Sequence, residues 1–251
     1  MVKTDQPTIF DSDKIAVILS SKADGNTRPE WGPQADVEQA VGKLAKELNL
    51  APDHVVVMNV GAHQGAWDEI ADITSADGQG LTDPDERVEA DALVTTVPGA
   101  ALLLPVADCN AVVIHDPEQN VLALVHLGWQ STVADLATKI VQYLQQKYRS
   151  SAPNLRIYFS PAIKAESYVF DSVKQADDPA WKPFLHKTDK GIGVDLPGFN
   201  RQRFVDAGVL PEHIEVSPVN TATSDEYYSH YRAVRNGEPE GRFAVLVALK
   251  G

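Results

Sequence analysis

Residues 107–129 read ADCNAVVIHDPEQNVLALVHLGW, and this stretch decides the fold expected for the chain. Two apolar runs flank Asp116-Pro117-Glu118-Gln119, where Asp at the first position and Pro at the second are typical of a type I turn. A four-residue loop built on such a turn makes an antiparallel hairpin. If residues 116 and 119 pair, the same register places Cys109 directly opposite His126 on one face of the hairpin.

Outside the hairpin, short apolar runs alternate with segments of helical periodicity. Strands are predicted at 15–19, 55–60, 92–96, 100–106, 111–114, 121–125, 156–160, 214–219 and 243–249, and helices at 36–48, 133–144 and 200–207. Because the elements alternate irregularly and include a hairpin, a mixed β-sheet flanked by helices fits better than a purely parallel sheet. We predict a single α/β domain over residues 1–251, since no linker interrupts the pattern.

Composition restricts the classes of protein that the chain can belong to. Its 251 residues are 43% hydrophobic, which is enough for a full buried core. With 22 Lys and Arg against 35 Asp and Glu, the net charge of −13 argues against nucleic-acid or anionic-membrane partners. Cys109 is the single cysteine, so no disulfide forms within the chain, and the N-terminus lacks a signal-peptide pattern. A cytoplasmic protein is expected.

The predicted pairing of Cys109 with His126 brings a thiol and an imidazole to one place. Cross-strand neighbours have Cβ atoms roughly 4.5–5.5 Å apart, and a thiolate beside an imidazole favours zinc over magnesium or calcium. A catalytic zinc normally has three protein ligands, and His63, in the Gly-rich turn 61–65, is the best third candidate. The spacing also fits two other interpretations: ordinary core or surface residues, or a metal-free hydrolase with Cys109 as nucleophile and His126 as base.

Several segments resemble one known family. Ala107-Asp108-Cys109 followed by His126-Leu127-Gly128-Trp129 is similar to the "ADC…HAGWRG" signature of the laccase-domain, or YfiH-like, family, often labelled multicopper polyphenol oxidoreductases. Further segments that resemble its motifs are Ser20-Ser21-Lys22 with Gly25, residues 90–95 (ADALVT), Pro161-Ala162-Ile163 with Tyr168, Ser229-His230-Tyr231-Arg232 and Gly241-Arg242. The resemblance therefore spans nearly the whole chain.

The resemblance implies an α/β/α fold with a mixed sheet and one zinc ion bound by His63, Cys109 and His126. It also implies phosphorolysis of adenosine, inosine, guanosine or methylthioadenosine, with phosphate as co-substrate and adenosine deamination as a second activity. The copper label does not fit the composition. A multicopper laccase needs many histidines, largely in His-x-His pairs, and this chain has seven histidines and no such pair.

The remaining candidate residues carry substrate-binding and proton-transfer roles. Asp108 is predicted to orient a water or exchange protons, with a backbone hydrogen bond in its turn as the alternative. Arg232 or Lys22 is predicted to hold phosphate, with a surface salt bridge as the alternative for Arg232. Gln130 and Ser229 are predicted to contact substrate or phosphate, although the family has an arginine where this chain has Gln130.

Two further expectations follow from this departure. A helix opening at Val133, capped by Thr132 and Asp135, would offer backbone N–H groups in place of the missing guanidinium. A non-catalytic relative that keeps the fold and the zinc is the remaining alternative to an enzyme.

Overall fold

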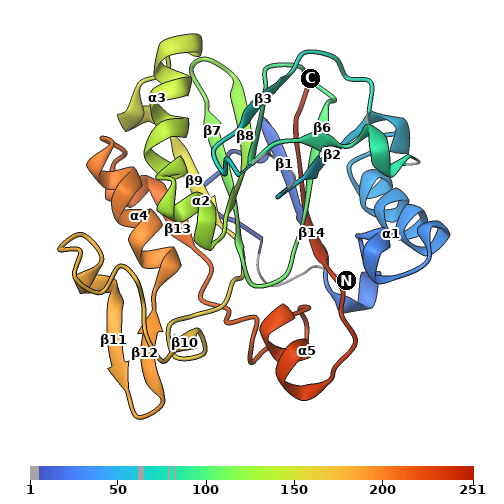
Figure 1. The fold of residues 1–251 in the computed structure, drawn as a ribbon. Helices are drawn as coiled ribbons and strands as arrows, with labels where there is room; N and C mark the ends of the chain where they lie inside the picture. The colour runs from blue at the N-terminus through green and yellow to red at the C-terminus, as the bar shows by residue number, and fades with distance from the viewer. Residues whose placement is uncertain (1–5, 62–64, 79, 82) are drawn as a thin grey trace.

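The computed structural model describes residues 6–61, 65–78, 80–81 and 83–251, and its strands form two large sheets and one small one (Figure 1). The five-stranded sheet has the order β1 (Ile15–Leu19), β14 (Phe243–Leu249), β6 (Ala101–Val106), β2 (Val55–Asn59) and β4 (Val88–Glu89). The six-stranded sheet has the order β13 (Ile214–Val216), β9 (Arg156–Phe159), β7 (Asn110–Asp116), β8 (Val121–Leu127), β5 (Ala92–Thr95) and β3 (Ile70–Ile73). The small sheet has the order β10 (Val169–Phe170), β12 (Gly191–Val194) and β11 (Leu185–Thr188). Both large sheets contain parallel and antiparallel pairs, as the sequence predicts.

Helices cover the outer faces of the two large sheets (Figure 1). The α-helices of the described residues are α1 (Gln34–Glu47), α2 (Trp129–Val133), α3 (Leu136–Tyr148), α4 (Leu196–Asp206) and α5 (His230–Asn236), of which α5 lies at one end of the sheets (Figure 1). Short 3₁₀ helices lie at Lys22–Asp24, Pro29–Trp31, Pro52–His54, Pro84–Glu86, Ala152–Asn154, Lys182–Phe184 and Pro211–His213. Helix α1 packs against the five-stranded sheet, and α3 and α4 pack against the six-stranded sheet. None of the helices among the described residues has the length and apolar character needed to cross a lipid bilayer.

The main core lies between the two large sheets. Leu102 and Leu104 of β6 pack in the same buried cluster as Leu122 and Leu124 of β8, whereas Leu103 faces the α1 side. Alternate residues of each strand therefore pack into two different cores, one between the sheets and one beneath the helices. For this reason these strands are apolar throughout. The predicted α/β class with flanking helices is confirmed, but the strands divide into two stacked sheets instead of one.

The central hairpin forms with a register two residues away from the predicted one. Asp116 pairs with Val121, so the loop is 117–120 and His126 lies opposite Ala111 instead of Cys109. The reason is local: Oδ1 of Asp116 accepts hydrogen bonds from the backbone N of Glu118 and Gln119 at 2.9 and 3.2 Å, and Asn120 adopts a left-handed φ of 51°. Because side chains alternate with a period of two, this shift keeps Cys109 and His126 on the same face.

The helical segment after the hairpin also differs from the prediction. Helix α2 begins directly after Gly128, where Ser131 Oγ accepts a hydrogen bond from the Gly128 backbone N at 3.0 Å. The helical segment is interrupted at Asp135, whose φ is 59°, and α3 starts at the next residue. The predicted cap by Thr132 and Asp135 is wrong, because Arg203 binds the Asp135 carboxylate through Nε and Nη2 at 2.9 and 2.7 Å.

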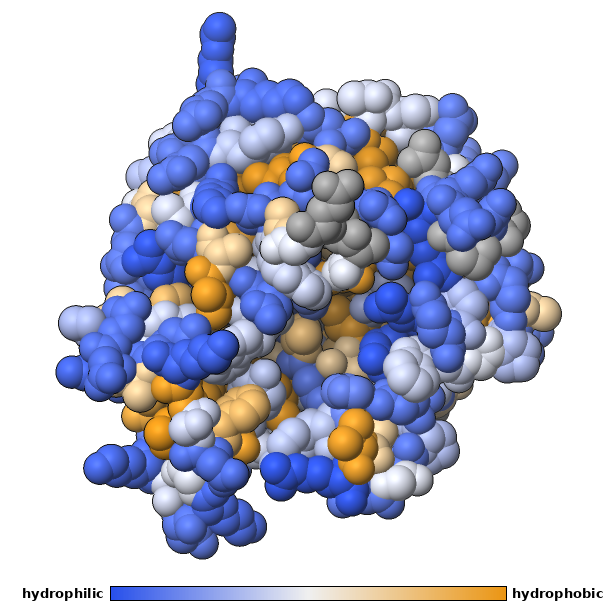
Figure 2. Space-filling view, viewed as in Figure 1, coloured by the Kyte–Doolittle hydropathy of each residue, from blue (hydrophilic) through white to orange (hydrophobic). Residues whose placement is uncertain are grey.

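The small sheet was not predicted. Strands β11 and β12 form a hairpin within the polar segment 171–200, and they cover a cluster of aromatic side chains next to α4. Trp181 stacks on Phe199 in this cluster, with ring centroids 4.0 Å apart. Figure 2 shows hydrophobic side chains gathered at the lower left of the molecule, where Figure 1 places β10, β11 and β12.

Candidate metal and substrate site

Cys109 and His126 face the space between the two large sheets, at one end of the sandwich. In β7 the odd-numbered Ala111 points into the inner core, and in β8 the even-numbered Leu124 does the same. The same alternation directs the side chains of Cys109 and His126 inward. There the strands end and leave a cavity of about 220 Å³, which both residues line together with the residues that follow β2 and β6.

The two side chains converge above Gly128. A Cβ atom built on Gly128 would lie 2.9 Å from Sγ of Cys109 and 3.2 Å from Nε2 of His126. Sulfur and ring nitrogen therefore both lie within 3.2 Å of one point, and only a glycine leaves that point open. A thiol and an imidazole nitrogen that converge in this way are donors of the kind that bind zinc.

The other ring nitrogen of His126 faces a buried carboxylate. Its Nδ1 lies 4.0 Å from Oδ1 of Asp91, and its backbone N donates to the Asp91 carbonyl at 2.8 Å. Asp91 is fully buried directly before β5, and its Oδ2 accepts a hydrogen bond from the backbone N of Glu69. A carboxylate on this side favours a proton on Nδ1. The Nε2 atom, which faces Cys109, then keeps its lone pair free to bind a metal.

Burial controls the protonation of the pair. It raises the pKa of the Cys109 thiol to about 12, with the Asp108 charge acting in the same direction and Arg242 opposing it. Burial also lowers the pKa of His126 to about 4, and the charge of Arg28 contributes. The apo pair is therefore a neutral thiol beside a neutral imidazole at neutral pH.

Two arginines and a histidine complete the cavity wall. Arg28 precedes a 3₁₀ helix, Arg242 precedes β14, and His230 starts α5. Nδ1 of His230 lies 2.6 Å from Oε1 of Glu240, whose other oxygen accepts a hydrogen bond from Nη1 of Arg242 at 3.0 Å. Cationic side chains thus face the space beside Cys109 and His126, which suits an anionic substrate.

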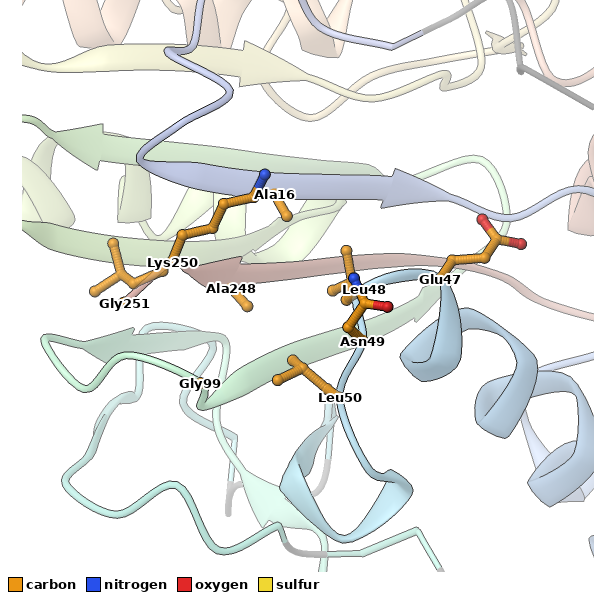
Figure 3. Close-up of a pocket in the computed structure, with 10 residues that line it drawn as sticks. Ala16, Glu47, Leu48, Asn49, Leu50, Gly99, Ala248, Lys250 and Gly251 are labelled. Carbon is orange, nitrogen blue, oxygen red and sulfur yellow. The ribbon is translucent and has the colours of Figure 1, made fainter.

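A larger cavity of about 360 Å³ lies elsewhere, between the end of α1 and the start of β1 (Figure 3). Its wall is formed by the segment Glu47–Leu50, by Ala16 and by the C-terminal residues from Ala248 onward. Glu47 and Lys250 are its charged side chains, and it holds neither histidine nor cysteine. Its chemistry therefore offers no candidate for catalysis or metal binding.

The family is shown by a match over most of the chain. Residues 29–250 match the family described as "Multi-copper polyphenol oxidoreductase laccase". The chain belongs to this family. That span includes Asp91, Cys109, His126, His230 and Arg242, so nearly all the cavity residues lie within the family domain.

Relatives of this laccase family are similar along most of their length. The chain is 26% identical over 226 residues to a protein of Bacteroides thetaiotaomicron named purine nucleoside phosphorylase, covering 86% of this chain and 82% of the relative. It is 29% identical over 212 residues to a protein of the same name from Corynebacterium glutamicum, covering 83% and 81%. Its fold is similar to YlmD from Geobacillus stearothermophilus, with a TM-score of 0.84, 24% identity and coverage of 98% and 94%. YfiH from Bacillus licheniformis gives a TM-score of 0.83 at 24% identity, with coverage of 94% and 93%.

Asp108 adjoins the site, but its carboxylate is fully engaged. Oδ1 accepts from Thr221 Oγ1 at 2.6 Å, and Oδ2 accepts from Ser229 Oγ at 3.1 Å and from the Tyr231 backbone N at 2.7 Å. Asp108 also has a φ of 78°, a backbone conformation that aspartate tolerates better than most residues. These contacts fix the start of α5 against the residue next to Cys109.

The predicted phosphate ligands do not line the cavity with Cys109 and His126. The guanidinium of Arg232 donates to the carbonyls of Thr221, Ser224 and Tyr227 at 3.2, 2.6 and 3.0 Å and pairs with Glu238 at 2.7 Å. The side chain of Lys22 is one-third exposed, with Nζ 3.8 Å from the same carboxylate of Glu238. Arg232 thus forms the salt bridge named as its alternative, and in addition it organises a loop.

Of the other predicted site residues, Ser229 is buried, Gln130 is exposed, and His63 lies outside the described part of the chain. Ser229 is buried, and its hydroxyl caps α5 by accepting from the Arg232 backbone N at 3.1 Å. Gln130 is exposed in the first turn of α2. His63 lies outside the described residues, although Gly61 before it lines the cavity. Among the described residues no group of three or more His, Cys, Asp or Glu forms a complete metal-binding set.

The sequence patterns gave no role to four residues of this site. Asp91 lies in the segment quoted for the family resemblance, where its position opposite His126 could have been found from the β5–β8 pairing. Arg242 and His230 lie in the quoted C-terminal segments but were given no role. Arg28 lies outside every motif considered, so the sequence held no signal for it.

Proposed function

We propose that this chain is a zinc-dependent purine nucleoside phosphorylase, with zinc held by His63, Cys109 and His126. One observation carries the proposal: Sγ of Cys109 and Nε2 of His126 converge on one point above Gly128, at the wall of an open cavity. The relatives named purine nucleoside phosphorylase supply the reaction class.

The donor set fits zinc. Nδ1 of His126 is buried without a hydrogen bond to any described residue, and it faces Asp91 as the non-coordinating nitrogen of a zinc-bound histidine faces its carboxylate. A zinc ion held by Cys109 and His126 would supply Lewis acidity and would stabilise the thiolate form of Cys109. His63 provides the third ligand of the proposal because it follows the cavity-lining Gly61 by two residues.

In the proposed reaction a phosphate oxygen forms a bond to C1′ of the ribose while the bond from C1′ to the purine nitrogen breaks. The base leaves with the bonding electrons and takes up a proton. In this proposal both reactants bind at the open cavity that Cys109 and His126 line, which would bring them together beside the two side chains. Asp108 acts as a positioning residue, since its hydrogen bonds from Ser229 and Tyr231 hold the start of α5, the helix that carries His230.

The metal-free cysteine hydrolase is disfavoured by the environment of the thiol. A nucleophilic cysteine needs a thiolate, which a cationic neighbour or a helix N-terminus normally stabilises. Here burial raises the pKa of Cys109 to about 12, and the pKa of its neighbour His126 is lowered to about 4. The two therefore do not form the thiolate–imidazolium pair on which that chemistry depends.

The test combines metal analysis with product analysis. The purified protein is expected to contain about one zinc per chain and to release free base from adenosine, inosine, guanosine or methylthioadenosine when phosphate is present. Ribose 1-phosphate is the expected second product. Inosine formed from adenosine without phosphate would register the deamination that the family resemblance implies.

Cys109→Ser and His126→Gln are the matched variants. Both are expected to lower zinc content and to reduce kcat/KM by about 100-fold or more, since each removes a ligand. The control is His186→Gln, on the exposed strand β11, with metal content and turnover unchanged. A protein that contains no zinc as isolated and after reconstitution, and releases no base, would contradict the proposal; so would a Cys109→Ser variant with full activity.

A further inference from the structure

We propose that Arg28, Arg242 and His230 form the subsite that binds the phosphate co-substrate, in place of the arginine that this chain lacks at position 130. The inference rests on the proposed phosphorolysis and names the residues that recognise its second substrate. Gln130 is exposed on α2 and does not line the cavity, whereas these three residues line it together with Cys109 and His126.

The two arginines are fixed next to each other by Asn26. Its Oδ1 accepts hydrogen bonds from the backbone N of Arg242 at 2.9 Å and of Arg28 at 3.2 Å, and its Nδ2 donates to the Arg28 carbonyl at 2.6 Å. The buried Thr27 adds two hydrogen bonds to the Arg242 carbonyl, from its N and its Oγ1, at 3.0 and 2.9 Å. These hydrogen bonds hold the backbones of the two arginines side by side at the cavity wall.

Both guanidinium groups keep donors for a ligand. Arg242 uses Nη1 for Glu240 and for the Gly241 carbonyl, at 3.0 and 2.7 Å, and its guanidinium carbon lies 5.0 Å from the ring centroid of Trp31. Its Nε and Nη2 make no hydrogen bond to a described residue. Arg28 uses Nε for Glu30 at 3.0 Å, and neither of its Nη atoms has a partner within the described part of the chain. Pre-oriented guanidinium donors match the oxygens of phosphate.

The charge balance of this cluster is unusual for the chain. The carboxylate of Glu30 is shared by Arg28 and Arg87, at 3.0 Å each, and the carboxylate of Glu240 serves Arg242 and an imidazole. Three guanidinium groups thus face two carboxylates, in a protein whose net charge is −13. The described residues that line the cavity include two arginines and no Asp or Glu, a lining that favours an anion such as phosphate.

The cluster also lies at the right place for the reaction. Arg28 and Arg242 line the same cavity as Cys109 and His126. An anion bound by the arginines would therefore lie beside the thiol and the imidazole. Glu240 is the positioning residue of this arrangement, since one of its oxygens contacts His230 and the other accepts from Arg242.

The experiment measures phosphate recognition in Arg28→Gln and Arg242→Gln. Binding of inorganic phosphate alone is measured by calorimetry, and the KM for phosphate is measured at saturating nucleoside. Each variant is expected to raise both constants about tenfold or more, because each loses charge-assisted hydrogen bonds. Arg242→Lys keeps the positive charge but loses the paired N–H donors of the guanidinium. Its Kd and KM for phosphate are expected to lie between those of Arg242→Gln and those of the unmodified protein. Arg201→Gln on α4 is the matched control, since Arg201 does not line the cavity.

The outcomes separate this inference from the proposed function. If the protein cleaves nucleosides with phosphate and the folded variants keep its phosphate KM, the subsite is wrong while the function stands. If phosphate binding depends on both arginines and no base is released, the function is wrong while the subsite stands. Adenosine 5′-monophosphate is the second ligand tested. Cleavage of this nucleotide that needs no added phosphate and is weakened in both variants would show that the cluster binds a nucleotide phosphate, and would overturn the assignment.

Discussion

Gly128→Ala is the most direct test of the convergence of Cys109 and His126. The new methyl carbon would lie 2.9 Å from Sγ of Cys109, 3.0 Å from Cε1 and 3.2 Å from Nε2 of His126. Non-bonded heavy atoms pack best near 3.5–4.0 Å, so the contact with sulfur is too close by about 0.6 Å or more. Gly128 has a φ of −99°, which other residues adopt freely. The cost of the substitution is therefore steric and falls on the two proposed ligands.

Overpacking of this kind costs about 1–3 kcal/mol of unfolding free energy. For a chain of this length, that corresponds to a Tm lowered by about 2–12 °C in a thermal melt. The larger effect is expected on zinc, because the methyl group would press against Sγ of Cys109 and the ring of His126 and displace both proposed ligand atoms. Zinc affinity, measured by competition with a chromogenic chelator, is expected to fall at least tenfold.

Gly42→Ala is the matched control. Its Cβ would lie 3.8 Å from Cγ of Pro52, an ordinary contact, and Gly42 lies inside α1. Alanine in a helix interior is more favourable than glycine by about 0.5–1 kcal/mol, so this variant should melt slightly higher and bind zinc normally. Unchanged zinc affinity and turnover in Gly128→Ala would refute the convergence argument, because no intact site could accommodate that methyl group.

Three further predictions concern residues outside the pair. Asp108→Ala leaves the buried donors of Thr221 and Tyr231 without an acceptor, so urea unfolding should show a loss of about 2–5 kcal/mol, and a loss below 1 kcal/mol would contradict the positioning role. Arg232→Gln should lower Tm while the phosphate KM changes less than threefold, and a tenfold increase would restore its predicted role as a phosphate ligand. Burial raises the pKa of Asp72, but hydrogen bonds from a lysine and two tyrosines outweigh it and leave the pKa below its ordinary value. Asp72→Asn should therefore be less stable than the unmodified protein at pH 7, and the difference in Tm should shrink as the pH falls below about 4 toward the lowered pKa of Asp72, whereas a constant difference would exclude this linkage.

The strands and the main helices could be predicted because their pattern is set by burial. The apolar runs at 15–19 and 243–249 coincide with β1 and β14, since β14 is buried throughout and the partly buried β1 pairs with it. The division into two sheets was not visible in the sequence. Thr95 and Ala101 lie in strands of different sheets, although only five residues separate them, because the turn at Pro98-Gly99 carries the chain between layers.

The sequence predicted those features of the site that depend on the alternation of side chains along a strand. It did not predict those that depend on tertiary contacts. The hairpin register was wrong by two residues, because Asp116 caps the loop and Asn120 turns left-handed, yet an even shift preserves the face of Cys109 and His126. The carbonyls that occupy Arg232 come from a loop whose path no local pattern encodes. The role of Arg28 depends on Asn26, which connects it to a segment more than 200 residues away.

The site draws its parts from both large sheets, and this has a consequence for how the reaction depends on the fold. The proposed zinc donors Cys109 and His126 belong to β7 and β8 of the six-stranded sheet, whereas Arg242 directly precedes β14 of the five-stranded sheet. The apolar core between the sheets, with Leu104 and Leu124 among its members, therefore sets the distance between metal donors and anion donors. Because packed interiors transmit small displacements, a change in this core should alter the phosphate KM and kcat together while zinc content stays constant. Substitutions in the α1 interface, on the outer face, should change stability without that kinetic signature.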